Sequence, residues 1–188
     1  MKRFICLTVV LLACASMTFA QTKAAKDFHF KPFLELMNFQ AKGESLNYYH
    51  DYAKNANLRL IYDVTEKSEI YYVWADGVTY KKGHMTESYT KEGNAPRCLN
   101  LDLCENGNGK YTPITITLVF PDKQAQNRFR AEGFKAGCKE NKEIYSTDVD
   151  PTWSNVSSIK YAKHAGAKSW RYIFFYEKDG MNMCTFLF

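Results

Sequence analysis

The sequence lacks the short motifs that mark the familiar classes of enzyme. Its 188 residues contain no Gly-x-Ser-x-Gly, no His-Glu-x-x-His, no Cys-x-x-Cys and no glycine-rich phosphate-binding loop. Histidine is rare and scattered, at His29, His50, His84 and His164. These absences exclude the enzymes that are defined by such motifs. The sequence therefore predicts no catalytic residue, no metal site and no cofactor.

Long apolar runs and strongly one-signed charge are also missing. After the first twenty residues, no stretch approaches the 18 or so apolar residues that a membrane-spanning helix needs. The formal net charge is +5, and no basic run interleaved with aromatic residues indicates a nucleic-acid surface. With 46% hydrophobic and 15% aromatic residues, the chain is too apolar for intrinsic disorder and long enough to bury a core.

Residues 1–20 have the pattern of a bacterial export signal. Two basic residues precede an apolar run over residues 4–15, and small residues occupy the two positions before the cleavage site that a signal peptidase reads. We expect cleavage after Ala20, a flexible lead-in over residues 21–27, and a secreted or periplasmic protein. The alternative is a lipoprotein, because the residues before Cys14 resemble a lipoprotein box that would leave this cysteine acylated and the protein membrane-anchored.

Four cysteines remain after the signal, at Cys98, Cys104, Cys138 and Cys184. An even number in an oxidising compartment predicts two disulfides. If residues 98–104 form a strand, its two ends lie roughly 20 Å apart at ~3.3 Å per residue. Cys98 and Cys104 would then pair with Cys138 and Cys184. If the stretch is a bent loop, Cys98–Cys104 and Cys138–Cys184 are the natural pairs.

Alternating apolar residues and turn signals predict the strands. Asp76-Gly77 and Asp179-Gly180 each stand between two apolar runs, a pattern typical of two-residue hairpins. Further strands are predicted at residues 57–64, 98–104, 114–120 and 156–163.

Two helices are predicted within residues 33–56, separated by a break at Gly43, and a third at 122–139. Gly133 and Gly137, four residues apart in the third helix, predict a close approach of that helix to a sheet. The fold class is α+β, a mainly antiparallel sheet with helices packed on one face.

Residues 28–188 are predicted to form one α+β domain, with two similar halves at 28–104 and 111–188 as an option. Each half contains a helix, a strand, an aromatic strand and an Asp-Gly turn. Such tandem helix-plus-sheet arrangements are similar in outline to secreted inhibitor proteins of the β-lactamase-inhibitor type. This resemblance is a fold-level analogy, and it implies an inhibitor-type function as one alternative.

The best candidates for binding lie in predicted loops. The long loop over residues 83–97 contains His84, Glu87 and Tyr89, and Trp153 lies in the loop over 148–155. The leading hypothesis is a secreted or periplasmic noncatalytic binding protein that recognises a protein, peptide or glycan through exposed aromatic residues. The other alternative is a hydrolase-like envelope enzyme whose site combines loop histidines with carboxylates.

Overall fold

Antiparallel sheet makes up most of the described protein. The computed structural model describes residues 27–38, 46–65, 69–83, 86–105, 111–145, 149–162 and 170–187. Its helices there are α2 (Phe30–Asn38), α3 (Asn47–Asn55) and α4 (Lys123–Lys135). Its strands there are β1 (Arg59–Thr65), β2 (Glu69–Asp76), β3 (Val78–Lys82), β4 (Glu87–Lys91), β5 (Arg97–Glu105), β6 (Tyr111–Phe120), β7 (Lys139–Asn141), β8 (Ser154–Ala162), β9 (Trp170–Lys178) and β10 (Met181–Leu187).

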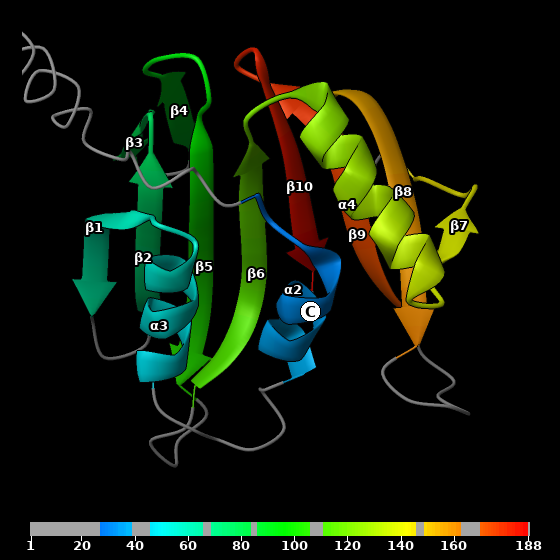
Figure 1. The fold of residues 1–188 in the computed structure, drawn as a ribbon, viewed down its shortest axis with the longest axis horizontal. Coiled ribbons are helices and arrows are strands. Elements are labelled where there is room, and N and C mark those ends of the chain that lie inside the picture. Colours follow the sequence, from blue (N-terminus) through cyan, green and yellow to red (C-terminus); the bar gives the residue numbers. More distant parts are fainter. Residues whose placement is uncertain are drawn as a thin grey trace, which may run out of the picture.

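Within the described ranges, eight strands form one sheet in the order β1-β2-β5-β6-β10-β9-β8-β7. Every neighbouring pair in it is antiparallel. β3 and β4 pair with each other in a separate two-stranded sheet. Figure 1 shows β6 and β10 in the middle of the large sheet and β1 and β7 at its ends. The prediction of a mainly antiparallel sheet accompanied by helices is confirmed.

The closing hairpin forms as predicted. Asp179 and Gly180 connect β9 to β10 with φ values of 53° and 70°, and a two-residue type I′ turn requires positive φ at both positions. Phe175 pairs with Cys184, as the two-residue turn demands. β10 also pairs with β6, so this hairpin belongs to the middle of the sheet.

The hairpin predicted at Asp76-Gly77 is wrong, because β3 does not return along β2. Instead β2 pairs with β1 and β5, and its residues 70–75 are all buried, as expected of a strand covered on both faces. At Gly77, with φ of 66°, the chain leaves the large sheet, and a Cβ there would lie 2.6 Å from the Glu92 carbonyl oxygen. The loop predicted over residues 83–97 also needs correction, since it contains β4.

The core between the helices and the large sheet, here called the helix-side layer, consists of aromatic and aliphatic side chains. Phe129 of α4 is completely buried, with ring centroids 5.2 Å from Phe30 and Phe120 and 5.3 Å from Phe33. Figure 1 shows α3 in front of the β2–β5 part of the sheet and α4 in front of β9. Other members of the layer are Tyr49, Ala53, Leu99, Leu101, Ile116, Leu118, Cys138, Ile173, Cys184 and Phe186.

Helix α4 approaches its neighbours closely at Gly133, as predicted. A Cβ at this position would lie 2.9 Å from Ile159 Cδ1 of β8 and 3.1 Å from Phe30 Cε2 of α2. The same prediction is wrong for Gly137, which follows the end of the helix with a φ of 95° and has no atom within 4 Å of a Cβ built there. Asp122 caps the start of the helix, and its carboxylate accepts a hydrogen bond of 2.7 Å from the Ala125 N–H. Gly133 thus lets α4 pack against both α2 and the sheet.

The opposite face of the large sheet carries a second core, here called the hairpin-side layer. The β3–β4 hairpin packs on it through Val78 and Tyr89. At its other end Trp153, which precedes β8, stacks on Tyr176 with a centroid distance of 3.8 Å and an interplanar angle of 7°. The remaining buried members are Tyr71, Val73, Ala75, Cys98, Val119, Phe174, Met181 and Met183.

The predicted disulfides are wrong, because all four cysteines of the described chain are free: Cys98, Cys104, Cys138 and Cys184. The stretch with the first two is a strand, so they lie at opposite ends of β5. Cys98 belongs to the hairpin-side layer and Cys138 and Cys184 to the helix-side layer, so the sheet separates Cys98 from both. Cys138 precedes β7, which lies three strands from β10 and thus roughly 14 Å from Cys184, too far for a disulfide.

Several predictions lie outside the described residues. These are the signal peptide over 1–20 with cleavage after Ala20, the lipid anchor at Cys14, and the lead-in up to residue 26. His84 and His164 also fall there. The division into halves 28–104 and 111–188 stays a prediction. No helix within the described ranges is long and apolar enough to cross a membrane.

Candidate functional site

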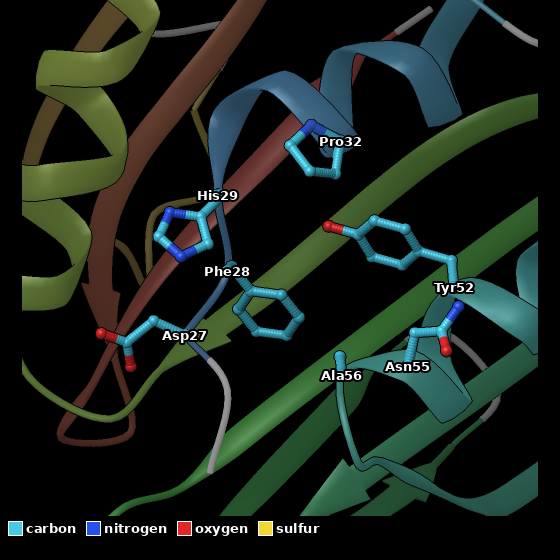
Figure 2. Close-up of a pocket in the computed structure, with 7 residues that line it drawn as sticks. All are labelled: Asp27, Phe28, His29, Pro32, Tyr52, Asn55 and Ala56. Atoms are coloured by element: carbon cyan, nitrogen blue, oxygen red, sulfur yellow. The ribbon is translucent and has the colours of Figure 1, made fainter. Parts of the chain in front are cut away.

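A pocket of about 340 Å³ lies between the start of α2 and the end of α3. Pockets of this size and larger, from roughly 300 Å³, are the usual sites for small ligands and partner side chains. Apolar groups supply most of the wall, with a phenol and an amide among them. The lining residues, drawn in Figure 2, are Asp27, Phe28, His29, Pro32, Tyr52, Asn55 and Ala56.

The end of α3 forms one wall of the pocket. Tyr52, Asn55 and Ala56 stand at positions i, i+3 and i+4, which lie on the same side of a helix. The buried guanidinium of Arg97, only 1% exposed, donates a 2.8 Å hydrogen bond to the Ala56 carbonyl and pairs with Asp76 at 2.9 Å. Arg97 therefore fixes the end of α3 against β2 and β5.

The segment that leads into α2 forms the other wall, and α4 holds it in place. Phe28 packs edge-on against Phe120 with a centroid distance of 6.0 Å. Arg128 Nη2 lies 2.6 Å from Asp27 Oδ2, an ion pair between α4 and this segment. These contacts fix the Phe28 side of the pocket relative to the sheet.

Glu132 of α4 caps the start of α2. Its Oε2 accepts a 2.8 Å hydrogen bond from the Phe30 N–H, and its Oε1 lies 3.1 Å from His29 Nδ1. A carboxylate at a helix N-terminus is favourable because the unpaired N–H groups there carry partial positive charge. Burial alone would raise the pKa of the Glu132 carboxyl, but the Phe30 N–H and the His29 ring together lower it below its usual value.

The pocket is suited to an apolar group that carries a hydrogen-bond acceptor. Phe28, Pro32 and Ala56 offer apolar surface, and Figure 2 shows the Tyr52 hydroxyl directed into the space between them. Burial raises the pKa of Tyr52, and the neighbouring Cys184 and Tyr48 side chains raise it further, so the phenol stays a donor. In the same view the His29 ring points away from Tyr52.

The residues predicted from the sequence do not line this pocket. Glu87 and Tyr89 lie together on β4 and face the large sheet, where Tyr89 is buried. Trp153 is half-buried on Tyr176, in the hairpin-side layer. His84 lies outside the described residues. The structure thus brings Glu87 and Tyr89 together, whereas Trp153 lies apart from them on Tyr176.

Glu87 and Tyr89 belong to a tyrosine cluster, made of Tyr71, Tyr80, Glu87, Tyr89 and Asn100. The Glu87 carboxylate accepts hydrogen bonds from the Tyr71 hydroxyl, from the Tyr89 hydroxyl at 3.1 Å and from Asn100 Nδ2 at 3.2 Å. The Tyr80 hydroxyl donates to that of Tyr71 at 2.8 Å. Burial and the Glu87 charge raise the pKa of Tyr71 and Tyr89, so these phenols act as donors that hold the hairpin on the sheet.

The thiols and acidic side chains of the described chain offer little chemistry. Burial raises the pKa of Cys98 and Cys184 and raises the pKa of Cys138 to about 11, so all three stay protonated and poorly nucleophilic. No group of three or more His, Cys, Asp or Glu residues in the described ranges could hold a metal ion.

Sequence reasoning missed the pocket, although it predicted two helices within residues 33–56. The pattern of the first predicted helix follows Phe28, and the pattern of the second contains Tyr52. Nothing in either pattern indicates that the start of one helix faces the end of the other. The side-by-side packing of α2 and α3 depends on Glu132 and Arg97, which are distant in sequence.

Comparisons with protein-family models, with curated proteins and with solved structures found no significant match to this chain.

Proposed function

We propose that this protein is an exported, noncatalytic binding protein and that the pocket between α2 and α3 receives an apolar group of a peptide or protein partner. The pocket itself carries the proposal, since Phe28 and Pro32 face Tyr52 and Ala56 across an open space. The proposal includes the predicted secretion to the periplasm or beyond, and the packing of α2, α3 and α4 on one face of the sheet.

The lining suggests what the bound group looks like. An aromatic or branched aliphatic side chain would cover the apolar walls, and each buried CH₂ contributes about 0.8 kcal/mol. A backbone carbonyl next to that side chain would accept from the Tyr52 hydroxyl or the Asn55 amide at the rim. A phenylalanine or leucine residue within a peptide has both features.

The hydrolase-like alternative finds little support in the described residues. His29 and Glu132 do form a histidine–carboxylate pair, with a separation of 3.1 Å. However, the second Glu132 oxygen accepts from the Phe30 N–H, and the His29 ring points away from the Tyr52 hydroxyl. This pair therefore acts as a helix cap. The inhibitor-type alternative would use the pocket against a protein partner and differs from our proposal only in the consequence of binding.

Calorimetric titration with N-acetylphenylalaninamide, and with N-acetylalaninamide as the smaller comparison, tests the proposal. The wild type should bind the phenylalanine compound more tightly. Ala56→Leu fills the pocket and should weaken binding at least about tenfold, and Tyr52→Phe should weaken it about threefold through the lost hydrogen bond. Lys54→Ala, an exposed change on α3 outside the lining, is the matched control and should leave the affinity unchanged.

Two results would overturn the proposal. One is equal affinity of the wild type for the two compounds. The other is that N-acetylphenylalaninamide binds the Ala56→Leu variant as tightly as it binds the wild type, while thermal melting shows that the variant is folded.

A further inference from the structure

A second surface with defined chemistry lies on the opposite face of the sheet from the pocket. It consists of Trp170 and Tyr172 of β9, Lys160 of β8 and Lys139 of β7, here called the tryptophan platform. On β9 these two aromatic residues alternate with Arg171 and share a face with Phe174 and Tyr176, which lie in the hairpin-side layer. Tyr172 is 37% exposed, whereas Phe174, the next aromatic residue on that face, is 2% exposed.

The platform places two lysines directly opposite each other. Lys139 pairs with Lys160 in the β7–β8 register, and Lys160 pairs with Tyr172 in the β8–β9 register. Like charges at directly opposed positions of neighbouring strands repel and destabilise a sheet. Among the described residues, neither lysine forms an ion pair with a carboxylate, and Glu140, between them in the chain, pairs with Arg130 instead.

Trp170 partly offsets this repulsion. Lys139 Nζ lies 5.6 Å and Lys160 Nζ 5.5 Å from the centroid of its ring, so both ammonium groups face one indole. At an exposed site a cation–π contact contributes only about 0.5–1 kcal/mol, less than a carboxylate or sulfate positioned between two cations would supply. The charge of the pair thus favours an anionic ligand beside the ring.

We propose that the tryptophan platform binds an anionic carbohydrate, whose sugar ring stacks on Trp170 and Tyr172 while its carboxylate or sulfate group lies between Lys139 and Lys160. Pyranose rings have an apolar C–H face that suits the electron-rich face of an indole or phenol. They also hold an attached carboxylate at a fixed distance from that face. This surface is separate from the pocket, and the proposal does not depend on the proposed function.

Other anionic partners fit the platform less well. Tight binding of a nucleic acid requires many phosphate contacts, on the order of 6–10, and the platform supplies two lysines. An acidic peptide would neutralise the lysines through flexible side chains but would offer the two aromatic rings no rigid apolar face. The pairing of two rings with two cations matches the size of one or two sugar units.

Titration of the protein with hexagalacturonate tests the inference, with the methyl-esterified hexamer as the uncharged version of the same chain. The acid should bind, and the ester should bind at least about tenfold more weakly. Lys139→Gln combined with Lys160→Gln should weaken binding of the acid to the level of the ester. Trp170→Leu should weaken binding of both hexamers about tenfold, since it removes the stacking surface.

Matched controls separate the platform from the rest of the surface. Lys91→Gln on β4 removes an exposed lysine and Tyr145→Ala an exposed aromatic ring elsewhere, and both should leave the affinity unchanged. Tyr52→Phe should also have no effect, which separates this test from that of the pocket. Circular dichroism melting establishes that each variant is folded.

Three outcomes would overturn the inference. The first is absence of binding of hexagalacturonate to the wild type. The second is equal or tighter binding of hexaglutamate or of a hexathymidylate strand, which would indicate a peptide or nucleic-acid surface. The third is binding of hexagalacturonate that persists in the folded Trp170→Leu variant and in the double lysine variant.

Discussion

The two faces of the large sheet are covered in different ways. The helix-side layer is a mainly apolar core in which aromatic rings of α2 and α4 meet edge-on, as Phe129 does with Phe30 and Phe33. Arg97 and Gln126 are the buried polar side chains on this side, and both donate hydrogen bonds to backbone carbonyls. The hairpin-side layer contains buried polar side chains that lie in a row across the strands, interrupted on β9 by Phe174, and each polar member of the row has a hydrogen-bond partner. These side chains are Asn100, Thr117, Thr185, Ser158 and Asn141.

Hydrogen bonds within the polar row constrain the arrangement of the hairpin-side layer. Thr117 and Thr185 face each other across β6 and β10 with a 2.8 Å distance between hydroxyl oxygens, and the Tyr176 hydroxyl lies 2.7 Å from that of Thr185. Hydrogen bonds are directional, so buried polar groups accept few alternative arrangements, whereas apolar packing tolerates many. We infer that the helix-side layer supplies most of the stability and that the hairpin-side layer specifies how β3–β4 sits on the sheet.

The largest effect is expected from the apolar side. Phe129→Ala empties the centre of the helix-side layer, where this side chain is completely buried, and should lower the free energy of unfolding by about 3–5 kcal/mol. Urea denaturation followed by far-ultraviolet circular dichroism measures the change. Phe134→Ala, on the same helix with a side chain 40% exposed, is the control and should cost much less.

On the polar side, Asn100→Ala should lower the free energy of unfolding by about 2 kcal/mol. The substitution removes the donor to the Tyr89 hydroxyl, 2.6 Å away, and to Glu87, and leaves these buried groups with fewer partners. Hydrogen exchange should also rise in β3 and β4 before it rises elsewhere. If Asn100→Ala costs less than the exposed control Thr90→Ala, the role assigned to the tyrosine cluster is wrong.

The close approach at Gly133 should give a smaller change. Gly133→Ala improves helix propensity but brings a methyl group within 2.9 Å of Ile159 Cδ1, so the net loss of stability should be about 1 kcal/mol. Combining it with Ile159→Val, which removes that methyl group, should recover part of the loss. A double variant less stable than the sum of the single changes would contradict this explanation.

The smallest effect concerns pH. The pKa of Glu132 is lowered in the folded protein, so its capping of α2 stabilises the fold above the unfolded pKa, about 4.3. That contribution disappears as the pH falls through the folded pKa. The melting temperature of the wild type should exceed that of Glu132→Gln at pH 6, and the difference should shrink toward pH 3. A difference that is constant over this range would show that the charge of Glu132 has no part in the cap.

Local signals in the sequence predicted the parts of the fold that depend on neighbouring residues. The turn at Asp179-Gly180 fixed the register of β9 and β10 because both strands adjoin it. The same signal failed at Asp76-Gly77, since the partner of β2 is β5, which begins at Arg97 after an intervening hairpin. Strand β4 was missed because, of its five residues, only Tyr89 is buried.

The candidate sites were less accessible to such reasoning. Glu87 and Tyr89 were selected as binding candidates because they lie in a predicted loop. Their contacts with Asn100 depend on strand pairing that cannot be predicted from the local sequence. The disulfides were inferred from the expected compartment. The spacing of the cysteines along the chain does not indicate that the sheet separates Cys98 from Cys184. Predicting the pocket would have required placing α2, α3 and α4 correctly relative to one another.

Mapping the bound phenylalanine compound by nuclear magnetic resonance tests the central claim most directly. In a titration of ¹⁵N-labelled protein with N-acetylphenylalaninamide, we predict shifts of the amide signals of Phe28, Tyr52, Asn55 and Ala56 that saturate together. The amide signals of Trp170 and Tyr172, on the other face of the sheet, should not move. Saturable shifts confined to residues away from the pocket, or no saturable shifts at all, would contradict the assignment of this pocket as the binding site.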